Sequence, residues 1–442
     1  MNKISRLLAL LLAMLLCAVP AFGGLAEATD APVEATDTPE AVESPTDVLA
    51  TVNGTPILRE AVDVIASNLT YTYSQYGYDT SNAAFAKAVE QAALEYAIQF
   101  ELMQQKAVEL GLDQFTDEEM AQLKEENAQE WANLVDTYVS YYGGLTEEST
   151  DEDKLAAKTS ALAALEGMGY TEETMLQETI DYTRYDRVQA EMIKDATVTD
   201  EEIQAAFDEK AKADEASFKE DVASYEYMTQ YYGQPSYYVP EGYRGITHIL
   251  LKVDDELLSR YQTLTAELEE QEEAEDNPEA TTTDLEKTPV TQADVDAAYD
   301  AILASVQPTI DEINTKLANG TPFADLIKEY GTDPGMTSEP YASEGYSVHM
   351  DSVVWDPAFT QAAFTMEKVG DVAKPVVGSY GVHILHYLRD VPAGPVALTD
   401  TIKDELREQL LSEKESELFQ TTMQAWRDAS VITYAEGVEP LE

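Results

Sequence analysis

The sequence predicts an α+β chain in which a long helical region precedes a segment that mixes strands with helices. In the first half, apolar residues recur at four-residue spacing, as Leu94, Ile98 and Leu102 do, which is typical of amphipathic helices. In the second half, two β-rich runs, residues 246–252 and 381–385, bracket a further set of helical patterns. Because 442 residues exceed what one hydrophobic core usually holds, two or three domains are expected.

The chain is strongly acidic, with a formal net charge of −58 and a pI of about 4.1. Hydrophobic residues still make up 44 % of it, so it can bury real cores. An acidic surface repels phosphate backbones and anionic lipids, which excludes nucleic acid as a partner. The same charge favours weak attraction to basic or unfolded polypeptides, although a solvated acidic surface with no specific partner explains it equally well.

The N-terminus has the pattern of an export signal. Lys3 and Arg6 precede an apolar run from residue 7 to about residue 19. This run is too short to cross a bilayer, which takes about 20 residues, and small residues suited to cleavage follow it. We therefore expect a signal peptide at residues 1–23 and an extracytoplasmic location: secreted, in the cell wall or at the outer face of the membrane.

The only cysteine, Cys17, lies inside this signal. A lipid anchor on it is disfavoured, because Leu15 and Leu16 stand where a lipoprotein signal has small residues. Without the signal the chain has no cysteine and hence no disulfide, so its stability must come from packing. Residues 24–47 are rich in proline, threonine and acidic residues, and we expect them to form a disordered linker.

An N-terminal helical region is expected at residues 48–240. It opens with a hairpin signal at 48–57, where Asn53 and Gly54 separate two short apolar runs. Helices follow, and Thr116 and Thr199 each begin a capping-box pattern. The region ends in a stretch rich in tyrosine, glycine and proline that marks a domain border.

A second domain is expected at residues 241–390. An acidic insertion at about 254–290 interrupts it. This tract lacks both the glycine and the alternating ligands of a calcium loop, so no metal site is expected there.

The predicted elements after the insertion are a helix at 295–317, a helix at 323–330, a short helix around 359–366 and the strand at 381–385. A C-terminal helix is expected within 396–434, and the apolar triplet 431–433 is expected to form a strand.

Three blocks of the second domain resemble the parvulin domain of PrsA- and SurA-type foldases. They are ITHILLK at 246–252, LANGTPFADLIKEYGTDPG at 317–335, and the closing stretch 356–385, and they occur in the family's order. The resemblance implies a helical chaperone module, built from N- and C-terminal helices, next to a parvulin-like domain with a small antiparallel or mixed sheet flanked by helices.

The resemblance also implies an activity and a site. The activity is peptidyl-prolyl cis-trans isomerisation with chaperone function, without a cofactor or metal, acting on unfolded or partly folded secreted polypeptides at X–Pro bonds. Peripheral association with the membrane or cell wall and a dimeric state are compatible with it. The site residues that it implies are His248, Asp333 and His383 as catalytic residues, and Trp355, Phe359 and Phe364 around the substrate proline.

The sequence departs from the family pattern at two points, and the first leaves an alternative open. The family's Gly-Gly-Asp-Leu-Gly loop is replaced by residues 337–345. If this change has removed the activity, the chain is a non-enzymatic holdase that uses an inactive parvulin domain as a peptide-binding platform. No cluster of Lys or Arg lies near His248 in the sequence, so phosphorylated substrates are not expected.

Overall fold

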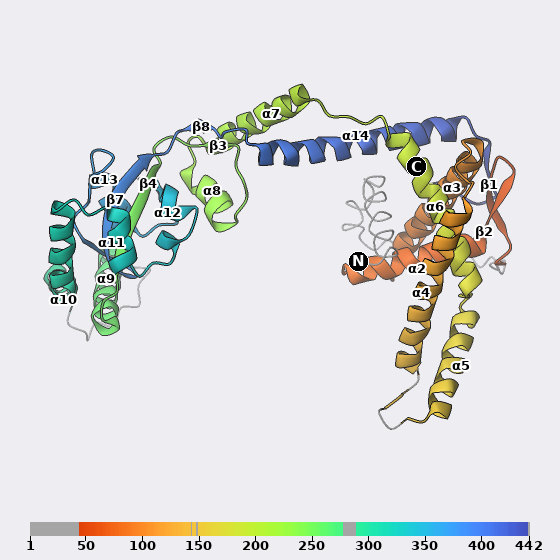
Figure 1. The fold of residues 1–442 in the computed structure, drawn as a ribbon, viewed down its shortest axis with the longest axis horizontal. Coiled ribbons are helices and arrows are strands. Elements are labelled where there is room, and N and C mark those ends of the chain that lie inside the picture. The colour runs from red at the N-terminus through yellow and green to blue at the C-terminus, as the bar shows by residue number, and fades with distance from the viewer. Residues whose placement is uncertain (1–43, 143, 147–148, 277–288, 441–442) are drawn as a thin grey trace. The chain divides into compact units, whose positions relative to one another are not determined.

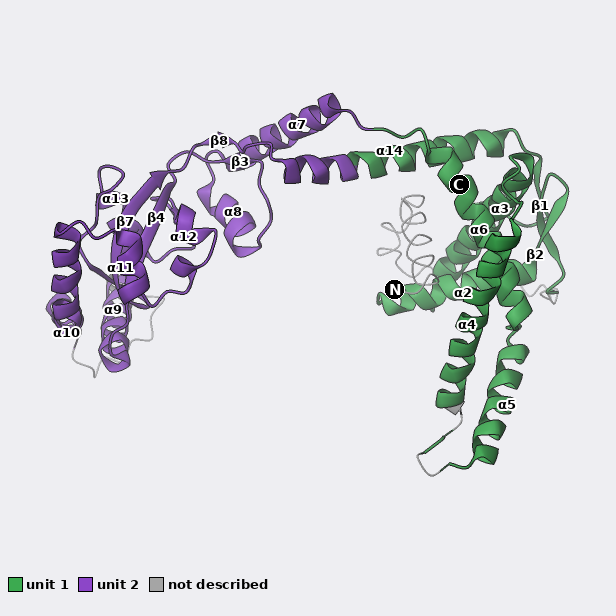
Figure 2. Ribbon diagram, in the orientation of Figure 1, with its two compact units in different colours: residues 1–197, 410–442 green, residues 198–409 purple. Residues whose placement is uncertain are grey.

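The computed structural model describes residues 44–142, 144–146, 149–276 and 289–440. The predicted signal peptide and most of the predicted linker lie outside these residues. The chain divides into two units, one made of residues up to 197 together with 410–442, the other of residues 198–409 (Figure 2). No helix among the described residues is long and apolar enough to cross a membrane.

The first unit begins with a three-stranded antiparallel sheet whose strands come from both ends of the chain. Strands β1 (Val48–Val52) and β2 (Thr55–Leu58) form the predicted hairpin, and β9 (Ile432–Tyr434) pairs with the other edge of β1. Asn53 and Gly54 have φ angles of 50° and 90°, the left-handed conformations that a tight hairpin turn requires.

Among its described residues, five helices and part of a sixth complete this unit. Helix α3 is its centre: Ile98, Leu102 and Met103 are almost fully buried. Phe419 and Met423 of the C-terminal helix α14 (Asp400–Asp428) pack into the same core, as the resemblance implied for that helix. The five helices are α2 (Arg59–Gln75), α3 (Ala83–Glu109), α4 (Asp117–Tyr142), α5 (Asp151–Gly167) and α6 (Glu172–Ile193), of which α4 and α5 form a long pair (Figure 1).

The second unit starts earlier than the border inferred from the sequence. By contacts it includes residues 198–240, which the sequence-based division grouped with the N-terminal region. The segment contains α7 (Asp200–Phe218), which begins with the predicted capping box at Thr199, then α8 (Val222–Glu226), the π-helix η2 (Tyr227–Tyr231) and strand β3 (Tyr238–Val239), which pairs with β8 (Gly394–Pro395).

A four-stranded antiparallel sheet forms the heart of this unit, in the order β5-β4-β7-β6. Its central strands are β4 and β7, in which Ile249 pairs with Ile384 and Leu250 with His383. The strands are β4 (Arg244–Leu251), β5 (Tyr346–Val348), β6 (Val376–Gly378) and β7 (Gly381–Asp390). No strand of this sheet is parallel, so of the two sheet types expected it is the antiparallel one.

Helices cover both faces of this sheet. On one face Ile249 and Ile384 pack against α10 (Gln292–Ala318) and α11 (Phe323–Tyr330). On the other face Ile246 and Leu385 pack against α13 (Pro357–Thr365). Side chains alternate along β7, so His383 shares its face with Leu385 and α13. The described part of the acidic insertion is α9 (Asp255–Asp276), which lies along α10.

Replacing Phe419 by alanine tests whether the C-terminal helix completes the N-terminal core. Truncating a buried phenylalanine removes about 3–5 kcal/mol of stability, because a cavity replaces its contacts. We expect hydrogen–deuterium exchange to accelerate in α3, while β4 in the second unit keeps its protection. The matched variant Ile302→Ala, in the core of the second unit, should give the opposite pattern. Equal exchange of α3 in wild type and Phe419→Ala would contradict this assignment.

Candidate active site

Two imidazole rings meet on the α13 face of the second sheet. His248 of β4 and His383 of β7 lie diagonally across the strand pair, and their Nδ1 atoms are 3.0 Å apart. The rings are nearly parallel, with centroids 5.0 Å apart and an interplanar angle of 19°. Only 3 % of His248 and 5 % of His383 is exposed. The alternation of side chains along β4 and β7 places both rings on this face of the sheet.

Asp333 fixes the outer side of His248. Its Oδ2 lies 2.7 Å from His248 Nε2 and also accepts a 3.0 Å hydrogen bond from the Tyr346 hydroxyl. Its Oδ1 accepts from the backbone N–H of Gly335 at 2.8 Å. The hydrogen bond from His248 is the main cause that lowers the pKa of Asp333 to about 2, against the opposing effect of its burial. At neutral pH this carboxylate is therefore ionised and can only accept hydrogen bonds.

The ionised carboxylate sets the order of protons along the chain of groups. Since Asp333 only accepts, His248 Nε2 carries a hydrogen and donates it to the carboxylate. One hydrogen between the two Nδ1 atoms, 3.0 Å apart, then joins His248 to His383. His383 Nε2 is buried and has no hydrogen-bond partner among the described residues. Burial, the largest cause, lowers the pKa of His383 to about 4, which keeps the ring neutral.

Aromatic rings lie beside the histidine pair. The ring of Phe359 of α13 is nearly perpendicular to both imidazoles, with centroid distances of 5.2 Å to His248 and 5.3 Å to His383. Trp355 lies 6.0 Å from Phe359 and 4.6 Å from Tyr346, and its Nε1–H donates to the Ser347 carbonyl at 2.9 Å. Tyr346 and Trp355 are half-buried, so they form the partly open rim beside the buried pair.

Phe364, which the resemblance placed in the proline pocket, has different neighbours. Its ring packs 4.4 Å from the guanidinium carbon of Arg244, which also lies 4.6 Å from the ring of Tyr387. Arg244 donates to the carbonyls of Ala363 and Met366 at the end of α13. Phe364 thus belongs to the packing that holds this helix end. Of the six residues implied by the resemblance, the structure brings together all but this one.

Sequence reasoning missed three residues at the site. Tyr346 reaches Asp333 from β5, after the replaced loop. Met336 is buried, and its sulfur lies 3.4 Å from the backbone N–H of His248. Asp356 caps α13 through Ala358 N–H and accepts from Ser379 N–H at 2.8 Å, close to His383. The Asp-Pro pair at 356–357 is a helix-start signal that could have identified Asp356; nothing comparable marks the other two.

The replaced loop at 337–345 is short of glycine but closely packed. It contains the helical turn α12 (Tyr341–Glu344) and ends at Gly345, which has a φ of +72°. A Cβ on Gly345 would lie 2.8 Å from the backbone of Ile246. This glycine therefore lets the loop rest directly on β4, two residues from His248.

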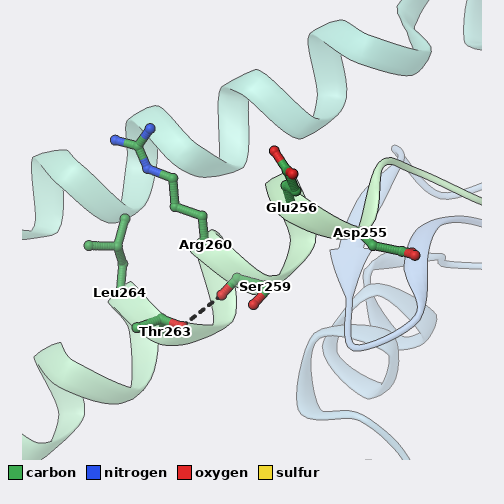
Figure 3. Close-up of a pocket in the computed structure, with 6 residues that line it drawn as sticks. All are labelled: Asp255, Glu256, Ser259, Arg260, Thr263 and Leu264. Atoms are coloured by element: carbon green, nitrogen blue, oxygen red, sulfur yellow. Dashed lines mark hydrogen bonds between the residues drawn. The ribbon is translucent and has the colours of Figure 1, made fainter.

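A surface pocket of about 510 Å³ lies elsewhere in the unit, on α9 (Figure 3). It contains none of the residues described above. The side chains that line it come from one helix and are Asp255, Glu256, Ser259, Arg260, Thr263 and Leu264. Among the described residues no group of three or more His, Cys, Asp or Glu side chains could hold a metal ion.

Comparison with known proteins places the domain in a family. Residues 291–389 match the family model of the PPIC-type PPIase domain, also called rotamase. The match begins after β4, so it includes His383 and Asp333 but leaves out His248.

Foldases are among the relatives. Foldase protein PrsA 2 of Listeria innocua is 33 % identical over 141 residues, which cover 32 % of this chain and 46 % of the relative. Foldase protein PrsA of Clostridium kluyveri is 29 % identical over 135 residues, which cover 30 % and 38 %. The chain therefore spans less than half the length of these two relatives.

Whole-chain similarity to solved structures is weak. The crystal structure of PrsA from Bacillus subtilis shares 18 % identity at a TM-score of 0.19, covering 87 % of this chain and 93 % of that one. A SurA-like chaperone of Campylobacter jejuni shares 15 % identity at a TM-score of 0.26, covering 69 % and 95 %. The chain thus carries a PPIC-type rotamase domain at residues 291–389 and is related to PrsA foldases over about a third of its length.

Proposed function

We propose that the second unit is an active peptidyl-prolyl cis-trans isomerase. The observation that carries the proposal is the continuous chain Asp333–His248–His383 beside the ring of Phe359, two of whose three members, Asp333 and His383, lie within the segment that matches the PPIC-type family model. The geometry supplies no nucleophile, and the reaction needs none, because rotation about an X–Pro bond breaks no covalent bond.

The physical requirement is a place where a twisted amide is more stable than in water. The uncatalysed barrier is about 18–20 kcal/mol, and each 1.36 kcal/mol removed from it gives about tenfold in rate. A twisted amide loses resonance, so its carbonyl is less polar than that of the planar form. An apolar pocket therefore favours the transition state over the solvated ground state. Phe359, Trp355 and Tyr346 would supply that apolar wall around the proline ring.

The histidines would keep this pocket weakly polar and rigid. A neutral, buried His383 places no net charge against the twisted amide. Its ring is held by His248, which in turn is held by the Asp333 carboxylate. Preorganised groups need not reorganise as the bond rotates, which is how a fixed polar network lowers a barrier.

We further propose that the chain acts outside the cytoplasm on unfolded or partly folded exported polypeptides. Its N-terminal sequence supports export, and its relatives named foldases support this class of substrate. The helical first unit would bind the polypeptide as a chaperone does. The isomerase substrate would carry no phosphate on the residue before proline. Peripheral attachment to the membrane or cell wall, and a dimer, are compatible with this role.

The second candidate is a holdase without isomerase activity. It is favoured by one observation: residues 337–345 replace the glycine loop of the family, and Gly345 rests directly on β4. In this case the second unit would bind proline-containing segments without accelerating their isomerisation.

An isomerisation assay on the full chain with a proline-containing peptide tests the two candidates. Both His383→Ala and Asp333→Ala remove a buried hydrogen bond, which is worth about 1–3 kcal/mol, so kcat/KM should fall about 10- to 100-fold. Tyr380→Ala, which truncates an exposed side chain in the turn between β6 and β7, is the control and should retain activity. Background rates for wild type and both variants would rule out the enzyme and leave the holdase.

The two phenylalanines of α13 should behave differently. Phe359→Leu removes the ring that packs against both histidines, so we expect KM for a proline peptide to rise about tenfold, corresponding to about 1.4 kcal/mol of lost binding. Phe364→Leu should leave KM unchanged and lower only stability, because its ring packs on Arg244. Steady-state kinetics with thermal unfolding measures both; a raised KM for Phe364→Leu would restore that residue to the pocket.

Stability should depend on pH through His383. Its folded pKa of about 4 lies below its ordinary value of 6.5, so between these values the unfolded chain binds more protons. The free energy of unfolding should therefore fall as pH drops from about 6.5 to about 4, and this contribution should level off below that. Asp333, with a pKa of about 2 against 3.8, adds a loss only below pH 3.8.

Urea unfolding at pH 4 to 7 measures this dependence. The difference between wild type and His383→Ala isolates one group from the many carboxylates that titrate in the same range. We expect the two stability curves to converge as pH falls towards 4. Parallel curves would show that His383 titrates normally.

A further inference from the structure

One buried carboxylate of the second unit lies outside the matched rotamase segment. Glu226 ends α8 and is 0 % exposed. Its Oε2 accepts from the Ser352 hydroxyl and from the Val353 backbone N–H, both at 2.8 Å. Its Oε1 accepts from the Tyr243 hydroxyl at 3.1 Å. Taking a carboxylate out of water is costly, so three donors converge on it.

These hydrogen bonds fix a loop that carries Trp355. Ser352 Oγ, held by Glu226, accepts from the backbone N–H of Trp355 at 3.3 Å. Trp355 Nε1–H is anchored at its other end to the Ser347 carbonyl. Glu226 therefore acts on the rim of the candidate active site through a chain of two hydrogen bonds, although 126 residues separate it from Ser352.

The surroundings make Glu226 part of a rigid cluster. The ring of Tyr243 packs 5.4 Å from Tyr225 and 5.1 Å from His349. Gly242, with a φ of +102°, lets the His349 ring approach, since a Cβ there would lie 2.6 Å from its Nε2. His349 Nδ1 accepts from Asp351 N–H at 3.0 Å, so the loop is held on both sides of Ser352.

We propose that Glu226 is a positioning residue for substrate binding, which holds the Trp355 loop against the proline site. The segment before β4 is then a working part of the isomerase unit and not a linker to it. This inference rests on the proposed function, because Trp355 matters only if the rim binds a proline-containing chain.

The expected effect is on binding more than on turnover. Glu226→Ala leaves Val353 N–H and the Ser352 hydroxyl without their acceptor, so the loop and Trp355 lose their fixed position. We expect KM for a proline peptide to rise about tenfold while kcat changes less than about threefold, the pattern of lost ground-state binding. Glu226→Gln should recover most of this, because its amide oxygen can serve Ser352 and Val353 while its NH₂ group faces the Tyr243 oxygen.

Fluorescence of Trp355 gives a readout that a general loss of stability does not move. The chain has three tryptophans, so Trp131→Phe with Trp426→Phe makes Trp355 the only one. In this full-length background, Glu226→Ala should raise acrylamide quenching of Trp355, and Glu226→Gln should not. Glu270→Ala, which removes an exposed glutamate of α9 in the same unit, is the matched control and should match the parent protein.

A variant that fails to fold does not end the test. Circular dichroism identifies such a case, and Ser352→Ala then takes its place, since it breaks the same chain of hydrogen bonds at its second link. A wild-type KM and wild-type quenching in Glu226→Ala and Ser352→Ala would overturn the inference. A lowered kcat at unchanged KM would also overturn it.

Failure of the isomerase proposal looks different. Titration of the single-tryptophan protein with the same peptide gives a Kd without turnover. If wild type is inactive but binds, and Glu226→Ala raises Kd about tenfold, positioning by Glu226 stands and catalysis does not. If wild type is active but Glu226→Ala retains both KM and Kd, catalysis stands and positioning by Glu226 does not.

Discussion

The hydrogen bond between His248 Nε2 and Asp333 Oδ2 is the constraint on which the candidate site depends. An ionised carboxylate can only accept, and this requirement places a hydrogen on His248 Nε2. It also helps to explain why a buried histidine pair is tolerated. The inner nitrogens of the pair satisfy each other at 3.0 Å, and the carboxylate charge lies at the less buried end, where the Asp333 side chain is 18 % exposed.

The scaffold must bring together groups that are far apart in the sequence. His248 and His383 are separated by 135 residues, and the acidic insertion accounts for a large part of that separation. Lengthening a surface connection costs little, about 0.6 kcal/mol for each doubling of its length. Its described part forms α9 along α10, so the added chain leaves the pairing of β4 with β7 intact.

Sequence patterns that involve only neighbouring residues were sufficient to predict several local elements of this structure. The Asn53-Gly54 turn and the capping box at Thr199 each depend on a few neighbouring residues, and both have the expected form. Phe364 shows where the resemblance reached its limit. Five residues separate it from Phe359, which places the two rings about 140° apart around a helix of 3.6 residues per turn. The two rings therefore leave the helix in different directions, and the helix predicted for this segment already implied this, although both rings contact the same hydrophobic cluster.

Tyr346 and Glu226 could not have been found in that way. Tyr346 follows a loop that departs from the family pattern, so no motif gives its register, and only the pairing of β5 with β4 points it towards Asp333. Glu226 lies in a stretch whose composition is that of a linker, yet its carboxylate is fully buried against a loop more than a hundred residues away. The segment that matches the family model is therefore smaller than the folded unit. The strand that supplies His248 and the helix that supplies Glu226 both precede residue 291. Without the strand that supplies His248, the site is incomplete.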